Sequence, residues 1–171
     1  MPNRPAADEH APYYARYIAL VPDGDFVAVL HGAHVDLVSR LRAVRADREG
    51  FRYAADKWSV REAVQHLSDV ERVMSYRMLT FARGDQSPLP PFDENAWAQT
   101  SGADSRPLSL LVDEFVAVRG ATVALISSVQ RDAWANRGTM SGTPATAQAL
   151  AFIIAGHERH HAAIFAERYG V

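Results

Sequence analysis

The chain has 171 residues, about the length of one domain, and its 18 basic and 20 acidic residues give a net charge of −2 at pH 7. A dedicated nucleic-acid-binding protein needs a basic face, so this charge balance argues against one. The chain contains no cysteine, which excludes disulfides, a cysteine nucleophile and thiolate metal sites. Any metal would therefore be held by nitrogen and oxygen ligands.

The sequence predicts neither a membrane span nor a signal peptide. The longest fully apolar run, Ala149–Ala155, is far shorter than the ~20 residues of a transmembrane helix. Residues 1–14 contain proline, acidic residues and histidine, but not the apolar segment of a signal peptide. We therefore expect a cytoplasmic protein without a membrane partner.

Four segments have the apolar periodicity of amphipathic helices, and no segment has the alternation of a strand. The first helix is expected over residues 25–44, directly after turn-forming residues that can cap it. The second is expected over residues 60–83. Its start is marked by Ser59 and Glu62, which fit the S-x-x-E capping box, and Gly84 is placed to end it.

The two later helices are marked by prolines near their starts. The third is expected over residues 107–129 and begins with a proline, which suits a first helical turn. The fourth is expected over residues 143–169, with Thr143-Pro144 as its cap and first turn and Gly170 as its end. The Gly/Ser/Thr-rich residues 138–143 before it are predicted to form a loop.

The connection between the second and third helices, Gly84–Arg106, is rich in proline and contains Phe92 and Trp97. Helix hairpins usually have links of about 2–8 residues, so this longer segment should run back along the bundle and make the two helices parallel. Its aromatic residues should pack on the bundle. We predict an all-α, four-helix bundle of up-down-down-up topology, forming a single domain over residues 1–171 with residues 1–20 as an N-terminal extension.

Three of the seven histidines lie together in the last predicted helix. A helix turns by about 100° per residue, which places His157 and His161 about 40° apart on one face, among apolar neighbours. Two imidazoles so placed can converge on one metal ion, or they can be core residues that need other partners. His160 lies about 60° to the other side of His157 and is the weaker candidate ligand.

Candidate partners for this pair lie on the first two predicted helices. His66 lies on an apolar stripe, where a lone histidine is usually a core residue. Glu62 and Asp69, about one turn to either side, could orient its imidazole or supply an oxygen ligand, although the capping box already accounts for Glu62. His34 faces inward and could approach the same site. Arg77 also projects toward the stripe, where it suits a structural ion pair, a snorkelling side chain or an anionic substrate.

Residues 157–161 also fit the H-E-x-x-H pattern of metallopeptidases, in which the glutamate is the general base. No H-x-x-G-x-x-H extension follows, and no strand pattern is present to bind a peptide backbone, so a peptidase is not favoured. Glu158 is expected either in solvent or beside the metal ligands. Motifs of serine hydrolases and nucleotide-binding loops are absent.

Three groups of residues carry a family resemblance: Lys57–Glu62 with His66-Leu67 and Glu71-Arg72, then Phe92–Asn95 with Trp97, then Gly156–His161. In this order they resemble the second helix, the crossover and the last-helix metal motif of the DinB-like superfamily, of the YfiT-like kind. The resemblance extends from about Tyr17 to Tyr169.

This resemblance implies a four-helix bundle of up-down-down-up topology. It also implies a divalent metal, commonly nickel or zinc, held by His66, His157 and His161. Members are often homodimers, so a homodimer is expected. Some relatives use low-molecular-weight thiols such as bacillithiol or mycothiol, and others are described as metal-dependent hydrolases.

Three histidine ligands would leave an open coordination position, which is typical of catalytic metal sites. The leading prediction is a metal-dependent thiol S-transferase acting on a small-molecule substrate, because of the family resemblance and because the chain has no thiol of its own. Metal-dependent hydrolysis is one alternative. The other is a non-enzymatic, stress-associated metal-binding or dimerisation module.

Overall fold

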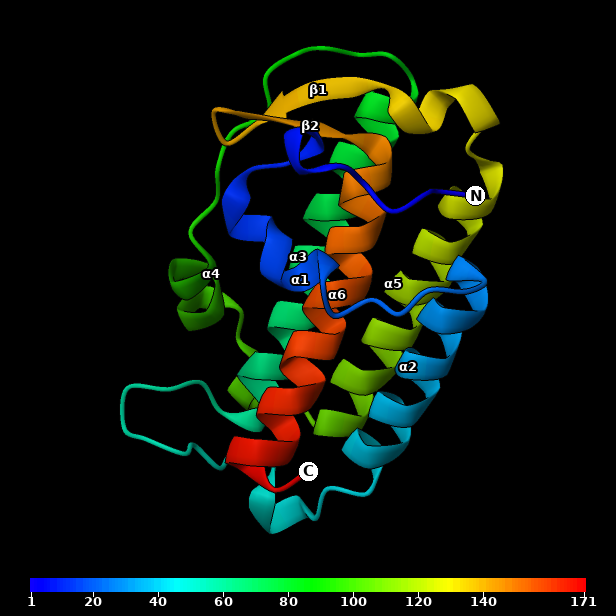
Figure 1. The fold of residues 1–171 in the computed structure, drawn as a ribbon. Coiled ribbons are helices and arrows are strands. Elements are labelled where there is room, and N and C mark those ends of the chain that lie inside the picture. Colours follow the sequence, from blue (N-terminus) through cyan, green and yellow to red (C-terminus); the bar gives the residue numbers. More distant parts are fainter.

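In a computed structural model that describes residues 1–171, capping side chains set the starts of three of the four long helices (Figure 1). Helix α2 (Phe26–Arg42) begins after Asp25, whose carboxylate accepts hydrogen bonds from two backbone N–H groups of the first turn. Helix α3 (Val60–Ala82) begins after Ser59, and the predicted capping box with Glu62 is present.

The other two long helices are α5 (Leu108–Ser128) and α6 (Ala147–Ile164). The chain continues from α6 into a π-helical turn, Phe165–Tyr169, which ends at Gly170. Gly170 has a φ of 71°, a left-handed conformation that glycine adopts without strain. The predicted glycine stop is therefore confirmed.

The topology is the predicted one: α3 and α5 run in the same direction, while α2 and α6 run opposite to them (Figure 1). The crossover between α3 and α5 contains a short helix, α4 (Glu94–Thr100), which lies beside the bundle. Phe92 and Trp97 stack with ring centroids 4.9 Å apart. Phe92 also packs on the core, whereas Trp97 stays 43% exposed, so only the first aromatic residue packs as predicted.

A β-hairpin replaces the predicted loop and the predicted first turn of the last helix. Strands β1 (Arg137–Met140) and β2 (Thr143–Thr146) pair antiparallel. Ser141 and Gly142 form the turn between them, with φ values of 51° and 77°. The prediction that α6 begins at residue 143 was wrong, because residues 143–146 pair with β1 and Thr146 is the actual cap of α6. Pro144 is tolerated in β2 because this is an edge strand, where a missing N–H breaks no ladder hydrogen bond.

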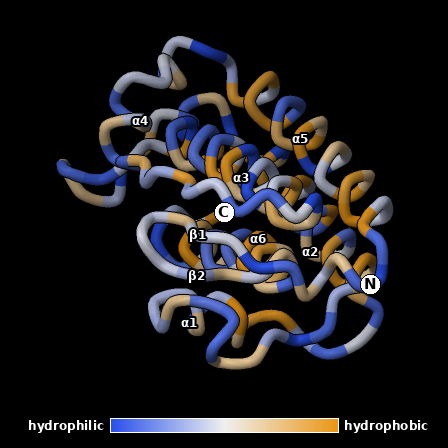
Figure 2. Tube along the Cα trace, turned by 90° about the horizontal axis from the view of Figure 1, so that it is seen from above, coloured by the Kyte–Doolittle hydropathy of each residue, from blue (hydrophilic) through white to orange (hydrophobic).

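The N-terminal segment packs across α6 through a short helix, α1 (Ala15–Ile18) (Figures 1 and 2). Tyr17 and Ile18 of this helix are buried. The contact is close because Gly156 of α6 has no side chain, and a Cβ there would overlap the backbone carbonyl of Tyr17. The first 20 residues therefore cover the bundle instead of extending away from it.

The apolar core consists of two clusters, one near the hairpin and one near the opposite end of the bundle. Polar side chains lie between them on every long helix; on α2, for example, His34 lies between Leu30 of the first cluster and Leu37 of the second. We call this set the central polar layer, and its members are His34, His66, Glu71, Arg119, His157, Glu158 and His161.

None of the helices is both long and apolar enough to cross a membrane.

Candidate metal centre

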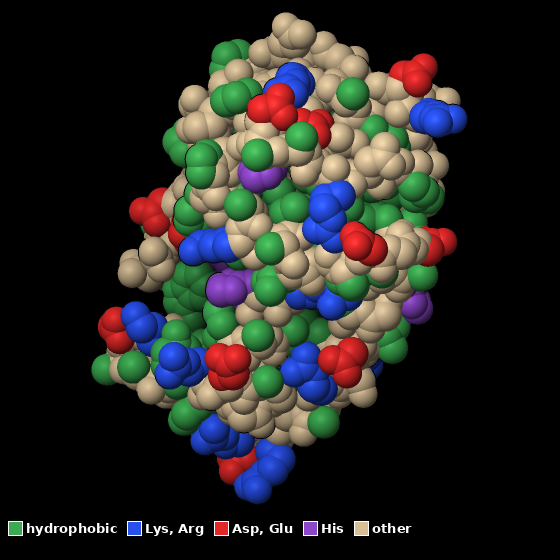
Figure 3. Space-filling view, in the orientation of Figure 1, with side chains coloured by type: hydrophobic (Ala, Val, Ile, Leu, Met, Phe, Trp, Pro, Cys, Tyr) green, Lys and Arg blue, Asp and Glu red, His purple; other side chains and the backbone are tan.

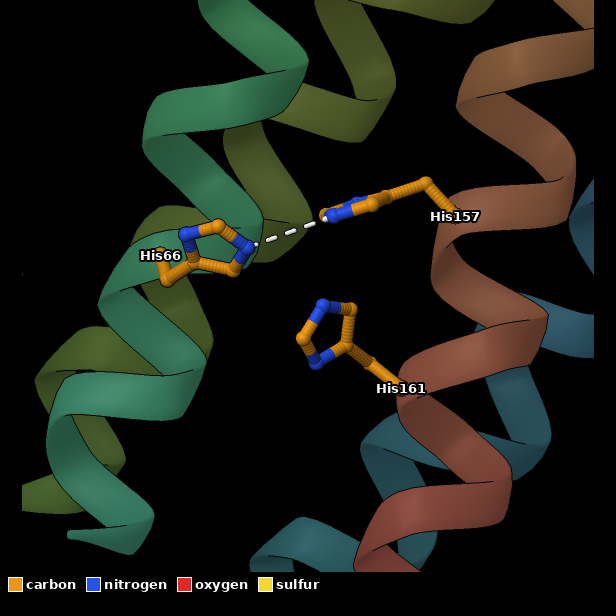
Figure 4. Close-up of side chains that lie close together, drawn as sticks. All are labelled: His66, His157 and His161. Carbon is orange, nitrogen blue, oxygen red and sulfur yellow. Dashed lines mark hydrogen bonds between the residues drawn. The ribbon is translucent and has the colours of Figure 1, made fainter. Parts of the chain in front are cut away.

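The three predicted metal ligands lie together in the central polar layer (Figure 4). His66 projects from α3, and His157 and His161 project from consecutive turns of α6 toward the same space. One ring nitrogen from each imidazole lies within 4.8 Å of the other two. The Nε2 atoms of His66 and His157 are only 3.2 Å apart. Helical spacing alone therefore brings His157 and His161 together, and the packing of α3 on α6 adds His66.

The separation and the charge state of these imidazoles fit a metal ion. Two nitrogens bound at ~2.0–2.1 Å to one tetrahedral ion lie roughly 3.3 Å apart, which matches the His66–His157 distance. Burial lowers the pKa of His66 to about 4. The pKa values of His157 and His161 are also well below the ordinary value, first through burial and then through the neighbouring histidines. All three are therefore neutral at pH 7, which is the form that binds metals.

The other half of the central polar layer is an ion-pair network. Arg119 of α5 binds Glu71 at 2.6 Å and Glu158 at 2.5 Å, and Nδ1 of His34 lies 3.1 Å from Glu158. Burial would lower the pKa of Arg119, but the two carboxylates raise it above its ordinary value. Glu158 is buried, and both its oxygens are hydrogen-bonded, so of the two expected places solvent is excluded and a place beside the candidate ligands remains. It is not placed as the general base of a metallopeptidase.

The remaining residues predicted around the ligands lie as follows. Glu62 accepts hydrogen bonds from the Ser59 backbone and from Arg52, and Asp69 binds Gln65 and Arg72. Neither carboxylate hydrogen-bonds an imidazole of the triad. Glu62 instead stabilises the start of α3, and Asp69 bonds neighbouring polar side chains.

His160 and His34 differ in their relation to the triad. His160 is partly exposed, and its ring lies edge-on to Tyr17 and His161, at 5.3 Å from each. His34 hydrogen-bonds Glu158, the neighbour of His157, and forms no hydrogen bond with the triad. His160 therefore flanks the ligands, and His34 belongs to the ion-pair network.

A pocket of about 350 Å³ opens onto the three histidines. Three tyrosines of the N-terminal segment, Tyr13, Tyr14 and Tyr17, form one wall. Figure 3 shows a hollow lined with hydrophobic side chains on this face of the molecule, with histidine and basic side chains at its margin. The remaining lining residues are Trp58, Val70, Met74, Arg77, Phe92, Glu94, Ser141 and Ile153.

A second pocket, of about 210 Å³, also touches His161. Trp58 lines both pockets, and its ring lies 4.4 Å from that of His66, so the indole stands where the two spaces meet. In the sequence Trp58 stands out only as a member of the Lys57–Glu62 motif, and nothing singles out the tyrosines. Their distance from His157 and His161 along the chain gives no signal that they share a site.

Comparison with known proteins agrees with the fold and with the family resemblance. The sequence model of the DinB superfamily matches residues 30–165, which include all three histidines of the triad. The solved structure described as "YfiT from Bacillus subtilis is a probable metal-dependent hydrolase with an unusual four-helix bundle topology" superposes with a TM-score of 0.73 at 17% identity, covering 99% of this chain and 94% of that chain.

A shorter match links the chain to a curated relative. A "Putative metal-dependent hydrolase" from Geobacillus thermodenitrificans (strain NG80-2) is 34% identical over 73 residues, which are 42% of this chain and 41% of the relative. The match thus spans about two-fifths of that protein's length. Because the family model covers most of the chain and the fold agrees over nearly all of it, this protein belongs to the DinB superfamily.

Proposed function

We propose that His66, His157 and His161 hold one divalent metal ion, zinc or nickel, and that the protein is a metal-dependent enzyme. The observation that supports this proposal is that three neutral imidazoles lie close enough to bind one ion, with no acidic residue among them. Two pockets adjoin this group. Three protein ligands leave a coordination position open, as in catalytic sites. An ion held there supplies Lewis acidity, which favours the deprotonated form of a thiol or a water molecule.

As the reaction, we propose the transfer of a low-molecular-weight thiol to a small-molecule acceptor. Two pockets that meet at Trp58 and His161 suit two substrates better than one. The chain has no cysteine, so the thiol must come from outside the protein. In this arrangement Trp58 separates the two substrates, and the tyrosine wall keeps water from the larger pocket.

Metal-dependent hydrolysis is the second candidate, and the names of both relatives favour it. It needs the same three histidines but only one bound substrate. A homodimer is also proposed, on the family resemblance. Light scattering coupled to size-exclusion chromatography tests it.

The first experiment is metal analysis by mass spectrometry on tag-free protein. We expect one ion per chain in the wild type, and its loss in His66→Ala and His161→Ala with helical circular dichroism retained. His160→Ala is the matched control, because it removes a histidine from the same helix outside the triad, and it should keep the metal. Wild-type protein that takes up no metal from Zn²⁺ or Ni²⁺ would overturn the proposal.

The second experiment separates the reactions. In Co²⁺-substituted protein, a low-molecular-weight thiol should change the visible absorption spectrum. Turnover without any thiol, lost in His161→Ala, would favour hydrolysis instead. A spectrum that no thiol or small anion alters would indicate a saturated ion and therefore a non-enzymatic module.

A further inference from the structure

Arg77 is a buried cation with no acidic partner. Its side chain, on α3, leaves only 2% of the residue exposed. Nη2 donates hydrogen bonds to the carbonyl of Pro90 at 2.7 Å and to the hydroxyl of Ser141 at 3.3 Å. Nη1 donates to the sulfur atoms of Met74 and Met140, which are weak acceptors. Every hydrogen-bond acceptor of this guanidinium is therefore uncharged.

The contrast with Arg119 shows that this is unusual within the same molecule. Arg119 is equally buried, at 3% exposure, and two carboxylates neutralise it. Burying a charge without a counter-ion is costly, so buried cations in proteins are normally paired. The desolvation of Arg77 lowers its pKa. The fold thus maintains one buried guanidinium that forms no ion pair within the protein.

Arg77 faces the pocket that opens onto the triad. It lines this pocket together with Tyr14, Phe92 and Glu94. Glu94 is exposed and forms no ion pair with Arg77 within 4.0 Å. Both charges act on Tyr14: burial raises the pKa of its phenol, Arg77 opposes that effect, and Tyr13 and Glu94 reinforce it. The guanidinium therefore faces the pocket without an ion-pair partner, and Glu94 is the one acidic residue in the lining.

Arg77 and His66 also share one face of one helix. They are separated by eleven residues, which is about three turns and a rotation of only about 20°, with a rise of roughly 16 Å. Helical side chains lean toward the N-terminus, so the Arg77 side chain leans back toward His66. A ligand lying along α3 can touch both ends of the pocket.

We propose that Arg77 binds a carboxylate of the substrate, whose apolar body lies along the tyrosine wall and whose reacting end reaches the triad. A guanidinium binds a carboxylate through two parallel hydrogen bonds. A singly charged group suits a site with one cation and a nearby glutamate better than a phosphate dianion does. This inference rests on the proposed function, because it names the substrate class for the same pocket.

The test uses calorimetric titration of metal-free protein with 6-phenylhexanoate and with its neutral primary amide. Wild-type protein should bind the carboxylate at least about tenfold more tightly than the amide. Arg77→Met, whose side chain suits a site between two methionines, should bind both within about twofold of each other. Arg77→Lys keeps the charge and should keep a preference for the carboxylate. Arg16→Gln removes an exposed arginine near the tyrosines and should keep the full preference.

A second measurement does not depend on a folded Arg77→Met variant. In the ¹⁵N spectrum of wild-type protein, the Nε–H signal of Arg77, assigned by its absence in Arg77→Lys, should shift with the carboxylate and not with the amide. No preference in wild type, full preference in Arg77→Met, or loss of preference in Arg16→Gln would each overturn the proposal.

Failure of this inference is distinguishable from failure of the proposed function. Wild-type protein that binds one metal ion per chain but does not prefer the carboxylate overturns the role of Arg77 alone. Wild-type protein that prefers the carboxylate but takes up no metal overturns the proposed function alone.

Discussion

The central polar layer has two halves of opposite character. In one half, Arg119 forms ion pairs with Glu71 and Glu158, and Nδ1 of His34 lies 3.1 Å from Glu158. In the other half, three neutral imidazoles lie within 4.8 Å with no carboxylate bound to them, and a pocket opens onto them. Both halves share helices α3 and α6. We call the ion-paired half the satisfied half, because its charges are paired across three helices and fix them, and the histidine half the unsatisfied half, because it has no carboxylate partner and suits the ligand proposed above.

The largest effect should come from removing the cation of the satisfied half. Arg119→Met leaves Glu71 and Glu158 buried without a counter-ion, and we expect a loss of about 3–5 kcal/mol in the free energy of unfolding. Urea denaturation followed by circular dichroism measures it. As a control, Arg119→Met combined with Glu71→Gln and Glu158→Gln should recover much of the loss. A single variant less than about 1 kcal/mol below wild type would contradict this assignment.

The unsatisfied half should make the metal-free protein sensitive to acid. Burial lowers the pKa of His66 from 6.5 to about 4, so between these values the unfolded chain holds a proton that the folded chain does not. The free energy of unfolding should therefore fall as the pH decreases from 6.5 to 4, by about 1.4 kcal/mol per pH unit for one such group.

Urea titrations at pH 7, 6 and 5 in the presence of a chelator measure this slope. His66→Gln, which cannot take up the proton, should have a shallower slope than wild type. Identical slopes for the two proteins would show that His66 titrates normally in the fold.

A smaller effect on stability should follow from disturbing the contact between α1, which carries part of the pocket wall, and α6. Gly156→Ala places a methyl group against the Tyr17 carbonyl, so α1 must move away from α6. We expect a loss of about 1–3 kcal/mol and faster hydrogen exchange in residues 13–18. Gly120→Ala is the matched control, because nothing lies within 4 Å of its added Cβ, and it should stabilise α5 by roughly 0.5–1 kcal/mol. Equal stability of the two variants would contradict the close contact.

The smallest effect should come from Asp69, which bonds Gln65 and Arg72 at the surface. Asp69→Asn should change the free energy of unfolding by no more than about 0.5 kcal/mol and should leave metal content unchanged. Mass spectrometry alongside His66→Ala makes this comparison. Reduced metal content in Asp69→Asn would show that this carboxylate supports His66 after all.

Most of the bundle was predictable because its signals are local. The capping box at Ser59 and Glu62 and the glycine stop at Gly170 each depend on a few neighbouring residues. The hairpin was missed because Thr143-Pro144 has the composition of a helix start as well as of an edge strand. Only the pairing of these residues with Met140 and Thr139 decides between the two.

The candidate site was predictable where helical spacing alone brings residues together. His157 and His161 are one turn apart, whereas the inclusion of His66 depended on a family resemblance. The partner of Glu158 could not be foreseen, because Arg119 approaches it from another helix. The isolation of Arg77 was equally hidden, since a missing counter-ion is a property of the packed structure.

The contact between α1 and α6 at Gly156 divides the site between two parts of the chain. All three imidazoles lie within the residues that match the family, 30–165, whereas the tyrosines that face them come before residue 30. On the proposed function, the metal ligands and one wall of the substrate pocket therefore belong to different segments of the chain, which meet at Gly156. Exchanging the N-terminal segment should then alter that wall of the pocket while leaving the three histidines and Arg77 in place.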